Sequence, residues 1–60
     1  MDFTISDFGN GFGVRATNLQ GDAFLERLKV KQDFLYEKEL LESLKEEIKS
    51  SGFSYEIARA

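Results

Sequence analysis

Cysteine and histidine are both absent from this chain of 60 residues. A domain of this size buries only about 60% of its unfolded surface, so it usually needs a disulfide, a metal or a partner for stability. The missing residue types exclude disulfides and zinc sites built from cysteine and histidine. We therefore expect one domain over residues 1–60, without cofactor or metal, that is stabilised by tight packing or by a second copy of itself.

Composition excludes several other classes of protein. Hydrophobic residues make up 42% of the chain, a content that argues against disorder. The net charge of −3 and the absence of a basic cluster argue against nucleic-acid binding and against attraction to anionic lipid. No apolar run is long enough to span a membrane, and no signal peptide is visible. These features favour a soluble cytoplasmic protein, and the small size is consistent with a bacterial or phage origin.

Residues 2–18 predict a β-hairpin. Asn10-Gly11 is a strong signal for a two-residue turn, because both residues tolerate the positive φ that such a turn needs. A turn there pairs Ile5 with Ala16 and Asp7 with Val14. One face of the hairpin is then apolar, with Phe8 as an apolar exception on the other face. The predicted apolar face consists of Phe3, Ile5, Phe12, Val14 and Ala16.

Residues 33–50 predict a long amphipathic helix, because Leu40, Leu41, Leu44 and Ile48 recur at helical spacing. We expect Asp33 to cap its start and Ser51-Gly52 to end it. Residues 53–58 alternate between apolar and polar side chains and predict a short strand.

Residues 22–31 are ambiguous. Asp22 can cap a short helix, which we favour, whereas the alternation from Leu28 to Lys31 fits a strand. A single straight helix over 22–50 would carry apolar side chains on two nearly opposite sides. Either the helix therefore breaks near residues 30–33, or one of those sides packs against another molecule.

These segments together predict an α+β fold of order ββααβ. The helical segment comprises a short helix and then the long amphipathic helix. The C-terminal strand completes a small antiparallel or mixed three-stranded sheet that packs on the long helix. We expect sheet order 2-1-3, with the third strand antiparallel to the first.

The motifs in the chain favour structure over catalysis. Asp7-Phe8-Gly9 and the glycines that follow resemble metal-binding and phosphate-binding loops, but the glycine spacing and the second strand after them fit only a hairpin. Carboxylates are the only available acids and bases, and they fall on solvated helix faces. The basic stretch Arg27, Lys29 and Lys31 is short and flanked by acids. We predict no enzyme activity and no catalytic, cofactor-binding or metal-binding residue.

Apolar residues beyond those that one thin core needs predict an interaction surface. We expect a protein-interaction module that forms a homo-oligomer, with a dimer favoured, or binds a protein partner. Two alternatives stay open: a small acidic inhibitor or DNA mimic, and a ligand-binding or enzymatic site that forms only at an oligomer interface. The candidate interface consists of Phe8, Phe24, Leu25, Leu28 and Leu35.

Overall fold

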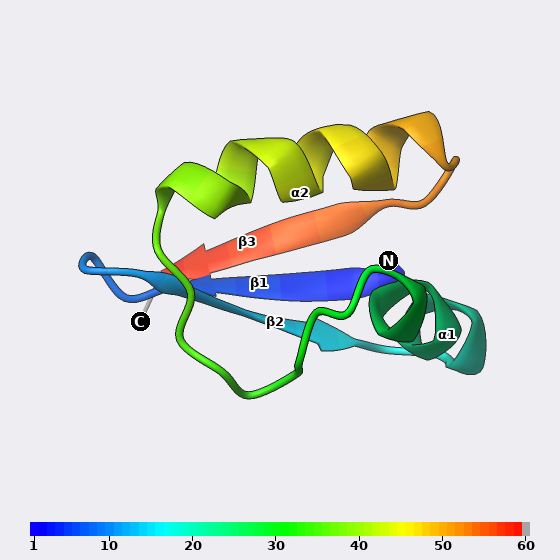
Figure 1. Cartoon of the computed structure of the whole chain (residues 1–60), viewed down its shortest axis with the longest axis horizontal. Helices are drawn as coiled ribbons and strands as arrows, with labels where there is room; N and C mark the ends of the chain where they lie inside the picture. Colours follow the sequence, from blue (N-terminus) through cyan, green and yellow to red (C-terminus); the bar gives the residue numbers. More distant parts are fainter. Residues whose placement is uncertain (60) are drawn as a thin grey trace.

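The computed structural model describes residues 1–59, and it confirms the predicted α+β class and the order ββααβ. The strands are β1 (Phe3–Asp7), β2 (Phe12–Ala16) and β3 (Tyr55–Arg59), and the helices are α1 (Leu19–Arg27) and α2 (Glu39–Ser50). The sheet order is β2-β1-β3, as predicted. In Figure 1, α2 runs along β3, and α1 lies near the start of β1.

A single core joins one face of the sheet to both helices. Alternate residues of β1 and β2 point into it, and the helices add the apolar side of α2 and two residues of α1. Phe3 is fully buried, and its ring centroid lies 5.7 Å from that of Phe24 and 5.5 Å from that of Phe53. The buried residues are Phe3, Ile5, Phe12, Val14, Phe24, Leu25, Leu41, Leu44 and Ile48.

The predicted hairpin is confirmed, but its register is wrong by two residues. β1 pairs Ile5 with Val14 and Asp7 with Phe12. The turn is centred on Gly9-Asn10, because Gly9 takes the positive φ of 88° and its N–H donates to Asp7 Oδ1 at 2.9 Å. A shift of two positions leaves every side chain on the same face, so the predicted apolar face is unchanged.

The helical segment divides into two helices, as the two-sided apolar pattern allows. Asn18 caps α1 by accepting a hydrogen bond from Gly21 N at 2.7 Å, so the predicted cap at Asp22 is wrong. Residues 22–27 are helical, and the strand alternative for 22–31 is wrong. α2 ends at Ser50 as predicted, with Gly52 at φ 81° just after it.

The predicted start of the long helix at residue 33 is wrong, because residues 33–38 form a linker before α2. Asp33 has φ 58°, which a helix cannot accommodate, and its carboxylate accepts a hydrogen bond from Arg15. Tyr36 forms an isolated bridge with Phe12 instead: Tyr36 N donates to Phe12 O at 2.8 Å, and Phe12 N donates to Tyr36 O at 2.9 Å. The linker thus follows the free edge of β2.

The third strand is parallel to β1, so the predicted antiparallel direction is wrong. The linker carries the chain back along β2, and α2 then runs the length of the sheet again (Figure 1). β3 consequently starts at the same end as β1. Hydrogen bonds from Asp2 N and Phe3 N to Ser54 O, at 3.0 and 3.2 Å, fix this start.

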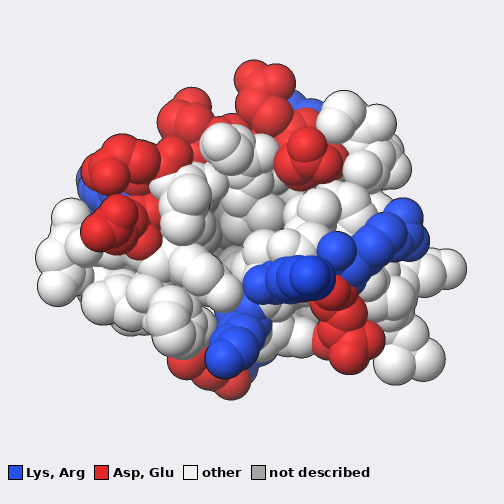
Figure 2. Space-filling view, in the orientation of Figure 1, with Lys and Arg blue, Asp and Glu red and all other residues white. Residues whose placement is uncertain are grey.

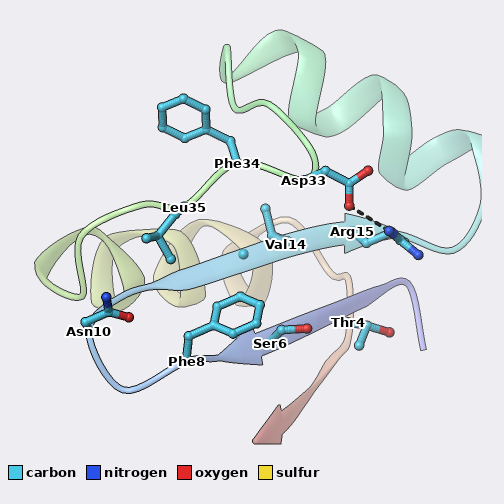
Figure 3. A pocket seen from close by; sticks show the side chains of 10 residues that line it. Thr4, Ser6, Phe8, Asn10, Val14, Arg15, Asp33, Phe34 and Leu35 are labelled. Carbon is cyan, nitrogen blue, oxygen red and sulfur yellow. Dashed lines mark hydrogen bonds and ion pairs between the residues drawn. The ribbon is translucent and has the colours of Figure 1, made fainter. Parts of the chain in front are cut away.

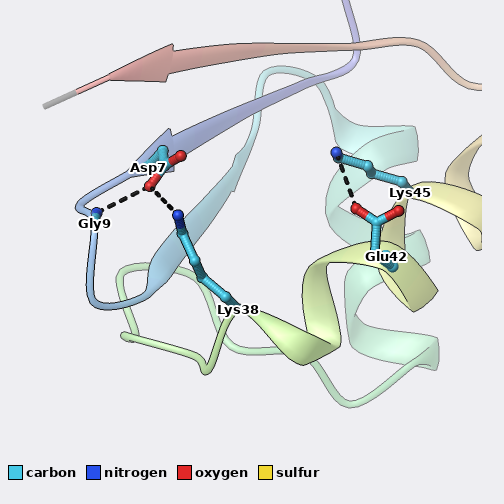
Figure 4. Close-up of polar contacts among 5 residues, drawn as sticks. All are labelled: Asp7, Gly9, Lys38, Glu42 and Lys45. Atoms are coloured by element: carbon cyan, nitrogen blue, oxygen red, sulfur yellow. Dashed lines mark hydrogen bonds and ion pairs between the residues drawn. The ribbon is translucent and has the colours of Figure 1, made fainter.

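Two carboxylates hold the ends of β1. Asp2 accepts hydrogen bonds from Ser54 N at 2.9 Å and from Asn18 Nδ2 at 2.8 Å. Asp7 accepts from Gly9 N and lies 3.5 Å from Lys38 Nζ (Figure 4). The hydrogen bond from Ser54 N lowers the pKa of Asp2, and the hydrogen bond from Gly9 N lowers the pKa of Asp7, below the ordinary value of 3.8.

These pKa shifts predict that acid destabilises the fold. A folded-state pKa below the unfolded value means that the unfolded chain binds more protons, so the free energy of unfolding falls as the pH drops from about 5 through the ordinary carboxyl pKa. We expect urea titrations between pH 7 and pH 3 to show this loss. Asp2→Asn should reduce the dependence of the free energy of unfolding on pH. If the free energy of unfolding depended equally on pH in wild type and in Asp2→Asn, the contribution assigned to Asp2 would be contradicted.

Candidate functional site

One face of the sheet has no helix over it within residues 1–59, because α1 and α2 both pack on the other face. The strand pairing defines two rows of residues across this open face. Thr4 pairs with Arg15 on one side and with Glu56 on the other, and Ser6 likewise lies between its partners on β2 and β3. The open face consists of Thr4, Ser6, Gly13, Arg15, Glu56 and Ala58.

A hollow of about 750 Å³ lies between this face and the linker (Figure 3). Three large apolar side chains border it although they are far from buried: Phe8 is 51% exposed, Phe34 is 48% exposed and Leu35 is 53% exposed. We call these residues the apolar cluster. Thr4, Ser6, Asn10 and Arg15 supply polar groups to the same hollow. The site therefore combines an apolar border with a polar floor.

The hairpin turn determines the position of Phe8. The Asp7 carboxylate and the positive φ of Gly9 fix the turn directly after β1, which leaves Phe8 on the outer side of the sheet. Gly13 has no side chain, and the Phe8 ring approaches to 3.5 Å from the place where its Cβ would be. The glycines that resemble a phosphate loop thus shape a hairpin and its neighbouring ring.

The linker determines the positions of Phe34 and Leu35. It is fixed to β2 at two points, where Gln32 Oε1 accepts from Ala16 N at 3.0 Å and where Tyr36 bridges Phe12. The positive φ of Asp33 turns the chain away from β2 between these points. Phe34 and Leu35 are therefore presented at the border of the hollow, with the Phe34 ring directed away from the sheet (Figure 3).

One ion pair lies at the other end of the hollow. Arg15 Nη2 is 2.6 Å from Asp33 Oδ1, and both side chains are exposed. The hydrogen bond to Asp33 raises the pKa of Arg15 above its already high ordinary value, so the guanidinium stays charged. Glu56, on the opposite edge strand, takes part in none of the ion pairs within residues 1–59.

The five residues of the predicted interface do not lie together. Phe24 and Leu25 are core residues, 6% and 1% exposed. Leu28 is half-buried and lines a separate apolar groove of about 210 Å³ between the linker and α2. Phe8 and Leu35 alone share the hollow. Phe34 also borders the hollow and was not predicted, because it falls within the helix predicted over residues 33–50.

Acidic side chains form a second surface feature. Figure 2 shows a band of carboxylates along α2, with Lys and Arg gathered lower in the same view. Two lysines near α2 are engaged in ion pairs, because Lys38 lies 3.5 Å from Asp7 and Lys45 lies 3.2 Å from Glu42 (Figure 4). The exposed acids of α2 are Glu39, Glu42, Glu46 and Glu47.

Comparison with protein-family models, curated proteins and solved structures finds no match for this chain. Neither α1 nor α2 is long and apolar enough to cross a membrane. In the part of the chain that the structure describes, no three acidic side chains converge as metal ligands would.

Proposed function

We propose that this chain is a small non-catalytic interaction protein that forms a homodimer through the open face of its sheet. The observation that carries the proposal is the apolar cluster: three large side chains, each about half exposed, border one hollow beside an uncovered sheet face. Scattered exposed apolar residues are ordinary on a protein surface, whereas a group of them on one face is typical of a contact surface.

The layer arrangement supports the same proposal. Helices cover one face of the sheet only, so the open face, which is polar at its centre and bordered by the apolar cluster, is available for a contact with another layer. A second copy brings a second sheet, so two open faces can cover each other as in a β-sandwich. Burial of the apolar cluster would contribute about 25 cal/mol for each Å² removed from water. A dimer of this kind also compensates for the small core of a 60-residue chain.

The double substitution Phe8→Ser with Phe34→Ser tests the proposal. We expect it to raise the dimer dissociation constant at least about tenfold in sedimentation equilibrium, because it removes two apolar contacts from the interface. Leu19→Ser is the matched control, since Leu19 is 86% exposed at the start of α1 and outside the hollow. A wild-type chain that remains monomeric at millimolar concentration, or a control with the same effect, would refute the proposal.

The acidic band on α2 favours a second candidate function, that of an inhibitor that binds a basic surface. Lys38 pairs with Asp7 and Lys45 pairs with Glu42, so Glu39, Glu46 and Glu47 supply the outward negative charge of the band. Such binding weakens with added salt, because exposed charges are screened. Calorimetry with a lysine-rich peptide should then detect salt-sensitive binding by wild type and weaker binding by Glu42→Gln with Glu46→Gln. Salt-insensitive binding would remove this candidate.

A further inference from the structure

The open face carries opposite charges on its two edge strands at the same level of the sheet. Arg15 lies on β2 and Glu56 lies on β3, and both pair with Thr4 of the central strand. Neighbouring strands are about 4.8 Å apart, so the two side chains start roughly 10 Å from each other across the face. Their arrangement gives the face a positive edge and a negative edge.

The second row of the face is asymmetric in size. On the β2 side the ring of Phe8 lies over Gly13, at 3.5 Å from its Cβ position. On the β3 side the corresponding residue is Ala58, because Ser6 pairs with both Gly13 and Ala58. One edge of the face is therefore raised and the other is low. A surface that matches this face must have its low side opposite Phe8 and its negative side opposite Arg15.

We propose that the matching surface is the same face of a second copy, related by a two-fold axis that runs parallel to β1. This axis exchanges the two edges, so β2 of each copy lies over β3 of the other. Arg15 then meets Glu56 of the second copy twice, once on each side of the axis. The Phe8 ring lies over Ala58 of the second copy, and Thr4 meets Thr4. This inference rests on the proposed homodimer and specifies its geometry.

Another two-fold axis in the plane between the sheets would run across the strands. That axis places β2 over β2 and β3 over β3. Each Arg15 would then lie over β2 of the other copy, which carries the second Arg15, and each Glu56 would lie over β3 of the other copy. Like charges would therefore oppose the contact. The charge pattern thus selects the axis parallel to β1.

Both charged groups can take part. Asp33 accepts from one nitrogen of Arg15, and a guanidinium has five N–H donors, so others remain for a second carboxylate. Glu56 is exposed and belongs to none of the ion pairs among residues 1–59.

Mixing two charge-reversed chains tests the axis. In Arg15→Glu alone each ion pair becomes two facing glutamates, and in Glu56→Arg alone it becomes two facing arginines. We expect either variant to dimerise about tenfold more weakly than wild type in sedimentation equilibrium. In a one-to-one mixture the introduced glutamate of one chain faces the introduced arginine of the other, and the native Glu56 faces the native Arg15. Native mass spectrometry should then show the mixed dimer as the main dimer, at close to wild-type affinity.

Two control variants distinguish the effect of the proposed axis from an effect of the overall charge of the chain. Arg27→Glu and Glu46→Arg make the same charge changes on the helices, and their mixture should gain no such preference for a mixed dimer. Glu56→Arg makes the chain less acidic, so the reduced general repulsion would strengthen self-association, whereas the proposed axis weakens it. A wild-type dimer whose variants form no preferred mixed dimer would overturn the axis and leave the homodimer standing. A monomeric wild type would refute both.

Discussion

Phe3→Ala should leave the chain largely unfolded at room temperature. Phe3 begins β1 and is fully buried against α1 and the approach to β3, where its ring joins those of Phe24 and Phe53. Truncation of a buried phenylalanine costs about 3–5 kcal/mol of unfolding free energy. The whole stability expected for 60 residues is only roughly 3–9 kcal/mol, at about 0.05–0.15 kcal/mol per residue.

Urea titration followed by circular dichroism measures this loss. Phe3→Leu keeps much of the apolar volume, so it should cost much less than Phe3→Ala and fold well enough to be titrated. Leu19→Ala is the surface control, and it should change the free energy of unfolding by less than about 0.5 kcal/mol. If Phe3→Ala cost under about 1 kcal/mol, the aromatic group would not be the centre of the core.

Gly11→Ala should destabilise the fold by about 2–3 kcal/mol, because the added methyl has no room. Its Cβ would lie 2.7 Å from Tyr36 O and 2.8 Å from Leu35 Cδ1. The Leu35 side chain can move, but the Tyr36 carbonyl is backbone and accepts from Phe12 N at 2.9 Å. The methyl therefore breaks the bridge between the linker and β2, and it displaces the residues that border the hollow.

Gly13→Ala is a closely matched control for this prediction. The nearest atom to its added Cβ would be Phe8 Cε2 at 3.5 Å, which is an ordinary contact. We expect it to be nearly neutral or slightly stabilising, because alanine restricts the unfolded chain. Amide hydrogen exchange should show earlier opening at Tyr36 in Gly11→Ala only. Equal stability of the two variants would show that the linker adjusts without cost.

The sequence predicted the hairpin and its faces because the alternation of Phe3, Ile5, Phe12 and Val14 has a period of two and survives any register shift by two. It did not predict the register. Asn10-Gly11 and Gly9-Asn10 both suit a turn, and the carboxylate of Asp7 decides between them by accepting from Gly9 N. A hydrogen bond from a side chain two positions away is not visible in the apolar pattern.

The linker shows why the site was predicted only in part. Phe34 extends the apolar spacing of α2, so a helix that starts at residue 33 fits the sequence well. Tertiary contacts override that spacing: Tyr36 pairs with Phe12, and Asp33 turns with a positive φ to meet Arg15. The exposure of Phe34 follows from those distant contacts. Phe8 was recognised because it broke the pattern of its own strand.

The direction of β3 depends on the same linker. The sheet order could be predicted by placing the first strand at the centre. The direction of β3, in contrast, depends on how often the chain crosses the sheet between β2 and β3. One helix over 33–50 would cross once, whereas the linker and α2 together cross twice. Whether Arg15 and Glu56 lie in one row across the sheet depends on the register of β3 as well as on its direction. The charge pattern of the open face could therefore not be derived from the sequence.

The central position of β1 also has a kinetic consequence. Its ladder with β3 joins Phe3 to Tyr55 and Asp7 to Arg59, so the sheet closes only when residues about fifty positions apart meet. The entropy of closing so long a loop must be lost before those contacts stabilise the chain. The hairpin and α1 can form from neighbouring residues, and the slow step of folding is then the arrival of the last strand beside the first.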